Sequence, residues 1–524
     1  MNEKLASMTY VLFILLSMTI AAAPGAQKTA PFQIEEATIA QVHAAMKAKQ
    51  LTCRDLVNQY LRRIEAFDKQ EPALNAIVQV NPDALKEADA LDRRFAKSGL
   101  SGPLHCVPTI VKDNFETIGL QSAAGSLSLK GFVSNKDAFL VKRIREAGAI
   151  VIAKSNMGEF AFSPLETVNS ILGTTRNPYS LDRVPAGSSG GTAAGVAANF
   201  GLAGLGSDTG NSIRGPSAHN ALVGIRSTMG LTSRAGVIPL SYLADIAGPI
   251  ARTVADAVAV FQAIVGEDPD DPVTARSHGR TIPNYSASLV GGGLKGARIG
   301  VLHQAYERAN LPVDEEVAKV FAKALEDLKA AGAEIVDPAP VDLSQIRRAQ
   351  GAGSCRGFKY DINEYLAKRG ERAPVHSLEE IIASGKFHES ARNRLEQAQR
   401  GTPQGPESDA CKAEAAYREA FGAAVTKVMD DLKLDAFVYP TWSQPPQLIG
   451  SVSQQQAGDN SQVFSPTSGF PAINVPMGTT RGTLPCGITF FGRAWSEATL
   501  IKLAYAYEQA TRHRHPPAFP GQQK

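Results

Sequence analysis

The sequence predicts an α/β fold, in which a β-sheet is covered by helices on both faces. Two observations point to this class. Short apolar runs alternate with helical patterns along most of the chain, the order expected when helices connect neighbouring strands. Hydrophobic residues make up 44% of the sequence and charged residues 20%, which is typical of a globular enzyme with a large core. The length of 524 residues is compatible with about two to four ordinary domains or with one large domain.

The amino-terminal residues resemble an export signal. Lys4 gives a basic start, residues 11–20 form an apolar run, and Ala21–Ala23 offer small residues for cleavage. The run is shorter than the roughly 20 residues that a membrane-spanning helix needs. We therefore expect residues 1–26 to be a cleaved signal peptide and the mature protein to be periplasmic or secreted, with an uncleaved amino-terminal anchor as the alternative.

Helical segments are indicated by apolar residues at intervals of three and four. In one clear case Thr52 caps a helix whose Leu56, Tyr60 and Ile64 share a face, and glycines such as Gly148 mark helix ends. The pattern predicts two helices within 35–69 and further helices at 82–96, 138–147, 192–199, 254–264, 314–331, 413–432 and 497–511.

The apolar runs between these helices predict the strands, at 106–111, 149–153, 202–205, 297–302, 334–336 and 436–439. The helix at 192–199 consists of small residues, which lets it pack tightly on the sheet. Residues from about 345 to 410 differ, because they are charged, helical in pattern and poor in β-branched residues. We expect this stretch, about 345–410, to be a helical insertion over the core and not an independent domain.

Charge and cysteine content exclude several classes of protein. A net charge of +3 gives no reason to expect nucleic acid or a charged membrane surface as a partner. Five cysteines leave at least one thiol unpaired in an exported protein. Cys355 and Cys411 are candidates for a disulfide, and buried apolar cysteines are the alternative. Without CxxC or HExxH spacings or a nucleotide-binding glycine pattern, we expect no metal and no cofactor.

Three polar residues could together cut an amide bond. Lys112 directly follows the apolar run at 106–111, and Ser188 and Ser212 lie in glycine-rich loops on either side of the small-residue helix. A lysine buried at a strand end can lose its proton near neutral pH, and a hydroxyl can pass a proton in either direction. The turn before Ser212 offers successive N–H groups of the kind that bind an oxyanion. Taken singly, the same segments also fit a surface lysine and ordinary Gly/Ser turns.

In their order these segments resemble the amidase signature family of hydrolases. The similarity runs from about residue 34 to residue 511. It is carried by residues 102–105, 112–114, 152–160, 175–179, 186–191, 206–214, 469–473 and 484–488. The resemblance implies one large amidase domain over 27–524, with a mixed, mostly parallel β-sheet core covered by helices on both faces.

The resemblance also implies a reaction, which is hydrolysis of a carboxamide C–N bond through an acyl-enzyme. Ser212 is then the nucleophile, Lys112 the general base, and Ser188 the proton relay, joined to Gly187 by a cis peptide bond. The oxyanion hole falls on the backbone of Thr209, Gly210, Asn211 and Ser212. We expect supporting roles for Asp208, Arg214, Ser189 and Asn114. The expected partner is a small-molecule amide, with no nucleic acid, no membrane after signal cleavage, and a monomer or homodimer.

One position departs from the family pattern. Asn211 stands where the family usually has a second glycine. Asparagine tolerates left-handed backbone angles, and its side chain could narrow the pocket or donate a hydrogen bond to substrate. Residues 240–245 and 439–449, with Trp442, are expected to line that pocket. Their apolar character favours aryl or alkyl amides over charged ones.

Other interpretations stay open on the same residues. Residues 187–191 also satisfy GxSxG, which would make Ser189 the nucleophile with a histidine such as His303, His376 or His388. Within the family, the chain could be the glutaminase subunit of an aminoacyl-tRNA amidotransferase, although an export signal argues against it. The same machinery could serve an esterase or carbamate hydrolase. A non-catalytic binding protein on this scaffold is the remaining alternative.

Overall fold

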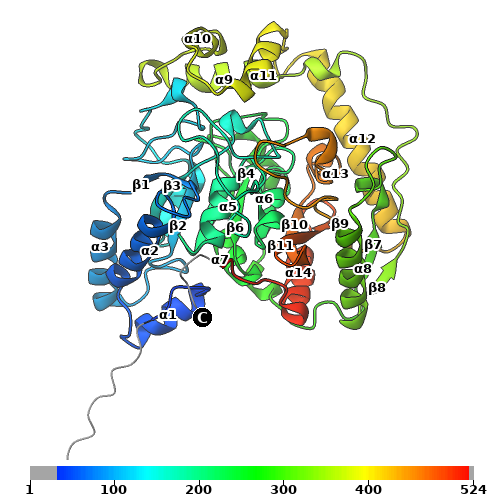
Figure 1. Ribbon diagram of the computed structural model, residues 1–524. Coiled ribbons are helices and arrows are strands. Elements are labelled where there is room, and N and C mark those ends of the chain that lie inside the picture. The colour runs from blue at the N-terminus through cyan, green and yellow to red at the C-terminus, as the bar shows by residue number, and fades with distance from the viewer. Residues whose placement is uncertain (1–31, 519–524) are drawn as a thin grey trace, which may run out of the picture.

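The computed structural model describes residues 32–518 of the chain. The predicted signal peptide, residues 1–26, lies outside the described residues. Within them, the strands form one eleven-stranded sheet that runs across the molecule (Figure 1). Its strands in spatial order are β1 (Ile77–Val80), β3 (Ile150–Ser155), β2 (Pro108–Lys112), β4 (Ala203–Asp208), β6 (Ile246–Ala251), β5 (Val223–Arg226), β10 (Ala472–Thr480), β11 (Leu484–Phe491), β9 (Ala436–Pro440), β7 (Arg298–Val301) and β8 (Glu334–Val336).

The sheet is mixed, as predicted, and the two kinds of pairing are segregated. Strands β3, β2 and β4 pair in parallel near one end, and β9, β7 and β8 pair in parallel at the other. From β4 to β9 the central pairings are antiparallel, as is that of edge strand β1 with β3. The expectation of mostly parallel strands therefore holds for the two flanks. In the centre, β6 follows β5 and β11 follows β10 without an intervening helix, which accounts for two of the antiparallel pairs.

Helices cover both faces of this sheet. Helices α4, α7, α14 and α8 contact one another in that order and form one layer, and α5 and α6 contact each other on the opposite face. A Cβ added to Gly487 of β11 would lie 2.7 Å from Cβ of Ala218 in α6. One added to Gly478 of neighbouring β10 would lie 2.9 Å from Cγ1 of Val320 in α8, on the other face. The helices, with short ones included, are α1 (Ile39–Lys47), α2 (Cys53–Phe67), α3 (Ala84–Ser98), α4 (Phe139–Glu146), α5 (Gly190–Ala197), α6 (Arg214–His219), α7 (Val254–Ile264), α8 (Glu315–Ala330), α9 (Phe358–Ala367), α10 (Leu378–Ser384), α11 (Glu389–Arg400), α12 (Asp409–Asp431), α13 (Phe464–Ser468) and α14 (Glu497–Thr511).

Helix α5 packs unusually close to the sheet, as its small residues predict. Every residue of α5 is buried. A Cβ added to Gly204 of β4 would lie 2.3 Å from Cγ2 of Thr192, and one added to Gly191 would lie 2.2 Å from the carbonyl oxygen of Asn156. Larger side chains cannot fit at this contact. The close approach sets the position of the loop that carries Ser188, directly before α5.

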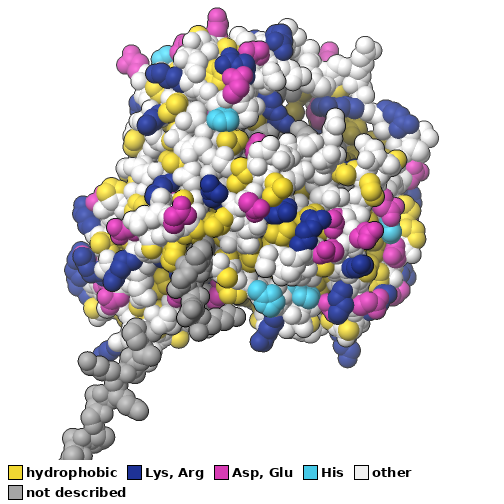
Figure 2. All heavy atoms as spheres, in the orientation of Figure 1, with side chains coloured by type: hydrophobic (Ala, Val, Ile, Leu, Met, Phe, Trp, Pro, Cys, Tyr) yellow, Lys and Arg dark blue, Asp and Glu magenta, His cyan; other side chains and the backbone are white. Residues whose placement is uncertain are grey.

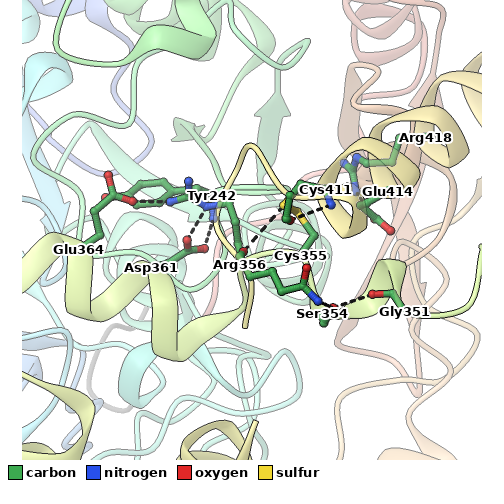
Figure 3. The surroundings of a disulfide bond; sticks show 12 residues. Tyr242, Gly351, Ser354, Cys355, Arg356, Asp361, Glu364, Cys411, Glu414 and Arg418 are labelled. Carbon is green, nitrogen blue, oxygen red and sulfur yellow. Dashed lines mark hydrogen bonds and ion pairs between the residues drawn. A yellow bond between two sulfur atoms is a disulfide. The ribbon is translucent and has the colours of Figure 1, made fainter. Parts of the chain in front are cut away.

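Helices α9, α10 and α11 form a cap above the sheet (Figure 1), in the stretch predicted to be helical. They have a small apolar core of their own, which includes Phe358, Leu378 and Leu395 and reaches Phe160 and Phe162 of the main body. A disulfide between Cys355 and Cys411 ties the segment before α9 to the start of α12 (Figure 3). We call the segment 345–410 the cap.

Four of the five cysteines are paired. Cys355 joins Cys411, as one of the two expectations had it, and Cys53 joins Cys106, which the sequence did not suggest. The alternative of buried apolar cysteines holds only for Cys486, which is free and buried.

The two ends of the described chain meet at one side of the molecule. The guanidinium of Arg514 makes two hydrogen bonds of 2.7 Å to the carboxylate of Glu36. Figure 1 shows α1, which follows Glu36, on the side of the molecule opposite the cap. Among residues 32–518, no helix is both long and apolar enough to cross a membrane.

Candidate active site

Lys112 lies at the end of β2 with its side chain wholly buried. Its Nζ donates to Oγ of Ser188 at 2.8 Å and to Oγ of Ser207 at 2.9 Å. Burial lowers the pKa of the Lys112 ammonium to about 7, although the carboxylates of Asp245 and Asp208 oppose the shift. A large fraction of this amine is therefore unprotonated near neutral pH.

Ser188 reaches Lys112 from the loop before α5. The peptide bond between Gly187 and Ser188 is cis. A Cβ on Gly187 would lie 2.2 Å from the carbonyl oxygen of Glu166, so only glycine fits before this bond. The structure thus brings two of the predicted residues, Lys112 and Ser188, into direct contact.

Ser207 was missed by the sequence reasoning, although it completes the surroundings of the amine. Its hydroxyl accepts from Lys112 and from Nδ2 of Asn114, the latter at 3.1 Å. Asn114 also donates to the carbonyl of Ile238 at 3.3 Å, which fits its expected role in holding the lysine loop. The pairing of β2 with β4, in which Val111 stands opposite Leu205, brings Ser207 to the end of β2.

Ser212 lies at the amino-terminal end of α6, in the turn that follows β4. Asp208 organises this turn, because its carboxylate accepts from the backbone N–H of Ile213 at 3.1 Å and from Nε of Arg214 at 3.1 Å. Arg226 of β5 forms a further ion pair with Asp208 at 3.1 Å. Although burial alone would raise it, the two guanidinium groups bring the pKa of Asp208 down to about 2. Asp208 and Arg214 thus scaffold the turn, and Arg226, on a strand that was not predicted, joins them.

Several backbone N–H groups of this turn have no acceptor among the described residues. The N–H groups of Gly210, Asn211 and Ser212 donate no hydrogen bond to any of the described residues. Neither Gly210 nor Asn211 has a positive φ. The left-handed backbone that the sequence argument allowed for Asn211 is therefore not needed, which explains why a residue with a side chain is tolerated there.

The Asn211 side chain turns inward and does not narrow a substrate pocket. It is fully buried, and its Nδ2 would lie 2.2 Å from a Cβ on Gly215. It lies beside Asp459, whose pKa burial raises to about 6, with the amides of Gln462 and Asn211 among the groups that oppose this shift. A direct contact between Asn211 and substrate, which we had considered from sequence, has no support in this arrangement.

Thr209 is held from the other side by a second carboxylate. Its hydroxyl donates to Oδ1 of Asp245, and Asp245 also accepts from the backbone N–H of Leu240 and Ser241 at 2.9 Å each. Burial raises the pKa of Asp245. Asp245 therefore links the turn that carries Ser212 to the loop that forms one wall of the cavity.

Ser212 opens onto a cavity of about 560 Å³. Its walls come from the turn, the loop before β6 that holds Leu240, α11 of the cap and α12. They comprise Ala161, Phe162, Pro164, Thr209, Gly210, Ser212, Leu240, Ala244, Arg348, Arg394, Glu414, Tyr417, Arg418, Gln462, Pro466 and Thr467. The prediction for 240–245 agrees with this lining through Leu240 and Ala244. Residues 439–449 do not line the cavity, and Trp442 is buried, with its Nε1 donating to the carbonyl of Gly215 at 3.1 Å.

Ser189 has surroundings unlike those of a nucleophile. It is fully buried and its hydroxyl donates to the carbonyl of Ser207 at 3.2 Å. No histidine in the described part of the chain is bonded to it, and His303 pairs instead with Glu307 and Asp337. The GxSxG interpretation therefore lacks its base, and the hydrogen bond of Ser189 to a backbone carbonyl is compatible with a supporting role. Across residues 32–518 no group of three or more His, Cys, Asp or Glu side chains is placed to hold a metal ion.

No hydrogen bond joins the hydroxyls of Ser188 and Ser212 in the described residues. Ser188 is bonded to Lys112, whereas Ser212 is 4% exposed and faces the cavity. The arrangement provides an amine whose pKa is lowered, a hydroxyl with which it can exchange a proton, and backbone N–H groups without an acceptor beside a second hydroxyl on a cavity. Such groups are those needed for nucleophilic attack on a carbonyl carbon.

The chain is similar to known amidases over most of its length. The sequence profile of the amidase family matches residues 55–501. A probable amidase of Arabidopsis thaliana is 35% identical, over 96% of each chain. A glutamyl-tRNA(Gln) amidotransferase subunit of Geobacter metallireducens is 32% identical, over 91% of this chain and 98% of its own. The crystal structure of a peptide amidase from Stenotrophomonas maltophilia superposes with a TM-score of 0.82 at 37% identity, covering 94% of this chain and 100% of that one.

Proposed function

This chain belongs to the amidase family of hydrolases that act on amide C–N bonds, and on that premise we propose that it is an exported carboxamide hydrolase using Ser212, Ser188 and Lys112. The observation that carries the proposal is the buried Lys112 amine, bonded to Ser188 at 2.8 Å beside a cavity on which Ser212 opens. A neutral amine in this place is a suitable general base.

In the proposed reaction Lys112 withdraws a proton from Ser188, and Ser188 takes the proton of Ser212. The oxygen of Ser212 attacks the carbonyl carbon, and the negative charge that develops on the carbonyl oxygen is stabilised by the N–H groups of Gly210, Asn211 and Ser212. The relay then returns the proton to the departing nitrogen, the C–N bond breaks, and an acyl-enzyme remains. Water, deprotonated through the same relay, releases the acid. Catalytic hydrogen bonds that are absent from a free enzyme commonly form once substrate is bound, as the Ser188–Ser212 bond must here.

Labelling at Ser212 tests this assignment. Incubation with a fluorophosphonate probe, followed by mass spectrometry, should place the label on the peptide that contains Ser212, and Ser212→Ala should lose both the label and amide hydrolysis. Ser189→Ala is the matched control, because it removes the hydroxyl next to Ser188 in the loop before α5. Label on Ser189, or amide hydrolysis that survives Ser212→Ala, would refute the assignment.

Export is supported by two features that are independent of each other. The first residues have the composition of a signal peptide, and two disulfides, Cys53–Cys106 and Cys355–Cys411, fit an oxidising compartment. Cell fractionation with amino-terminal sequencing tests the proposal. A mature protein that begins near residue 27 outside the cytoplasm is expected, and an intact amino terminus in the cytoplasm would contradict it.

Two other functions are distinguishable by experiment. Similarity to amidotransferase subunits points to a glutaminase that works in a complex, but the disulfides weigh against the reducing cytosol in which charged tRNA is found. Glutamine-dependent activity only with a co-purifying partner would favour it. An esterase or carbamate hydrolase would show faster turnover of a matched ester or carbamate than of the corresponding amide.

A further inference from the structure

The cavity at Ser212 carries an excess of positive charge. Within the described residues, its charged lining consists of the guanidinium groups of Arg348, Arg394 and Arg418 and the carboxylate of Glu414. This finding departs from the apolar pocket that the sequence predicted. Figure 2 shows basic side chains around a hollow between the cap and α12, on the face that it displays.

Glu414 cannot neutralise this charge. Its buried carboxylate accepts from Nε of Arg348 at 2.6 Å and lies 3.8 Å from Nη1 of Arg418. One carboxylate is thus shared between two guanidinium groups. Burial lowers the pKa of Arg418; Glu414 opposes this, whereas the like charges of Arg276 and Arg348 add to it. Such crowding of like charges without a bound anion is unfavourable and would be relieved by a negatively charged ligand.

Arg394 has no carboxylate partner at all within the described residues. It extends from α11 in the cap, donates one N–H to the carbonyl of Phe162, and lies over the Phe162 ring at 5.9 Å. A guanidinium has five N–H donors, so four remain for water or a ligand. Because the aromatic ring and the carbonyl fix its position, Arg394 is oriented without any anion present.

We propose that the cavity selects amide substrates that carry a carboxylate, bound by Arg394, Arg418 and Arg348. The proposal rests on the hydrolytic role of Ser212 and adds the substrate class. A planar carboxylate matches the fork of a guanidinium. The carboxylate can belong to the acyl part of the substrate or to the departing amine, and both sources share this chemistry.

Two matched substrate pairs distinguish these sources. The first pair, N-acetylglutamic acid α-amide and N-acetylmethionine α-amide, differs in the charge of the acyl part at similar side-chain length. The second pair, N-benzoylglycine and N-benzoylethylamine, differs in the charge of the departing amine. We expect the acidic member of one pair to have a kcat/KM about tenfold higher, the effect of a few solvent-accessible charge pairs together. Raising the ionic strength should reduce this ratio, since Arg348 and Arg394 remain open to solvent.

Substitutions assign the preference to the cavity. Arg394→Gln should lower the acidic-to-neutral ratio toward one and weaken its salt dependence, because Arg348 and Arg418 remain in the cavity. Arg392→Gln is the matched control on the same helix, because Arg392 pairs with Glu389 and Glu396 and does not line the cavity. Its ratio should equal that of the unchanged enzyme. A general loss of folding would lower both members of a pair and leave the ratio unaltered.

The outcome separates this inference from the hydrolytic proposal. Neutral amides cleaved at least as fast as the acidic members in both pairs would overturn the inference and leave Ser212 chemistry intact. If no amide is cleaved and Ser212 is not labelled, the hydrolytic proposal fails. Calorimetric binding of the same four compounds to Ser212→Ala then decides the inference, which equal affinities within both pairs would refute.

Discussion

Lys112 and Lys154 are both buried, but their surroundings suit them to different tasks. Lys154 of β3 donates to the carbonyl oxygens of Phe115 and Gln121, and its pKa is lowered by burial to about 8, with Asp113 opposing the shift. Lys154 also donates to the hydroxyl of Ser122 at 3.2 Å, but that hydroxyl in turn donates to the carbonyl oxygen of Phe115. Lys112 contacts the hydroxyls of Ser188 and Ser207, and Ser207 stands directly before the turn that carries Ser212. The position of these hydroxyls, more than burial of the amine, is why we propose Lys112 as the base.

The pKa of Lys112 predicts the pH dependence of the reaction. The base is active when neutral, so activity is low below a pKa of about 7 and rises to a plateau above it. The rate of acyl-enzyme formation with a small neutral amide, measured between about pH 5.5 and 9, should follow this limb. Lys112→Arg should be inactive over the whole range, because its guanidinium stays charged. A flat profile across that range would exclude Lys112 as the base.

Ser188→Ala should lower kcat by about two to four orders of magnitude, the usual contribution of a proton-transfer group. The change removes the hydroxyl of the proposed relay and leaves Ser207 as the remaining hydroxyl bonded to the Lys112 amine. Turnover and circular dichroism measured together check this. Ser189→Ala, one residue away, should retain most activity, because the Ser189 hydroxyl is bonded to a backbone carbonyl.

The segment between β4 and α6 depends on one buried ion cluster. Asp208 joins two backbone N–H groups and the guanidinium groups of Arg214 and Arg226, all three side chains being fully buried. Removing one partner of such a cluster leaves the others charged and without compensation. The shape of the turn that carries Ser212 is therefore coupled to the stability of the strands on either side of it.

Asp208→Asn should destabilise the protein by about 3–5 kcal/mol, the range for breaking a buried ion pair. Urea unfolding at neutral pH measures this, and Asp431→Asn, which removes an exposed partner of Lys427, should cost less than about 1 kcal/mol. Because the folded pKa of Asp208 is about 2, below the ordinary 3.8, its stabilisation is present above about pH 4 and is lost as the pH falls toward 2. Equal stability of the two variants would contradict the role given to Asp208.

The cap depends on its covalent tie to α12. The Cys355–Cys411 disulfide closes a segment with a sequence separation of 56, for which chain entropy predicts a stabilisation of about 4 kcal/mol. Replacing both cysteines with serine should make residues 345–410 more sensitive to limited proteolysis and raise KM, since α11 forms one wall of the cavity. The matched change of Cys53 and Cys106 should leave proteolysis of the cap unaltered. Equal protease resistance with and without Cys355–Cys411 would show that apolar packing alone holds the cap.

At the scale of the whole molecule, hydrophobic periodicity was enough to locate several helices and strands in the sequence. Helices α7 and α14 occur at the predicted residues, and β2, β3, β4 and β9 lie within a few residues of the predicted strands. Strands β5 and β6 were not predicted, because Gly224 and the Gly248–Pro249 pair suggest loops. Their strand conformation comes from pairing with β4 and β10, which are distant in sequence, and local propensity cannot report such pairing.

The residues of the candidate site likewise fall into those that local sequence predicts and those that depend on contacts between distant segments. Lys112, Ser188, Ser212 and the supporting Asp208, Arg214 and Asn114 stand in recognisable local sequences, and the structure places them around one turn and one strand end. Ser207 and Asp245 lie within the segments 206–214 and 240–245, but their contacts with Lys112 and Thr209 depend on the pairing of distant strands and loops, as does that of Arg226 with Asp208. A single sequence therefore offers little to identify their roles. The arginines of the cavity are harder still, because they come from a loop, from α11 and from α12.

The bond between Arg514 and Glu36 has a practical consequence for handling this enzyme. Both described ends of the folded chain emerge together, beside α1 and opposite the cap (Figure 1). A fusion partner or resin joined at either end of the described residues would therefore lie on the side away from the cap, where it leaves access to the cavity free.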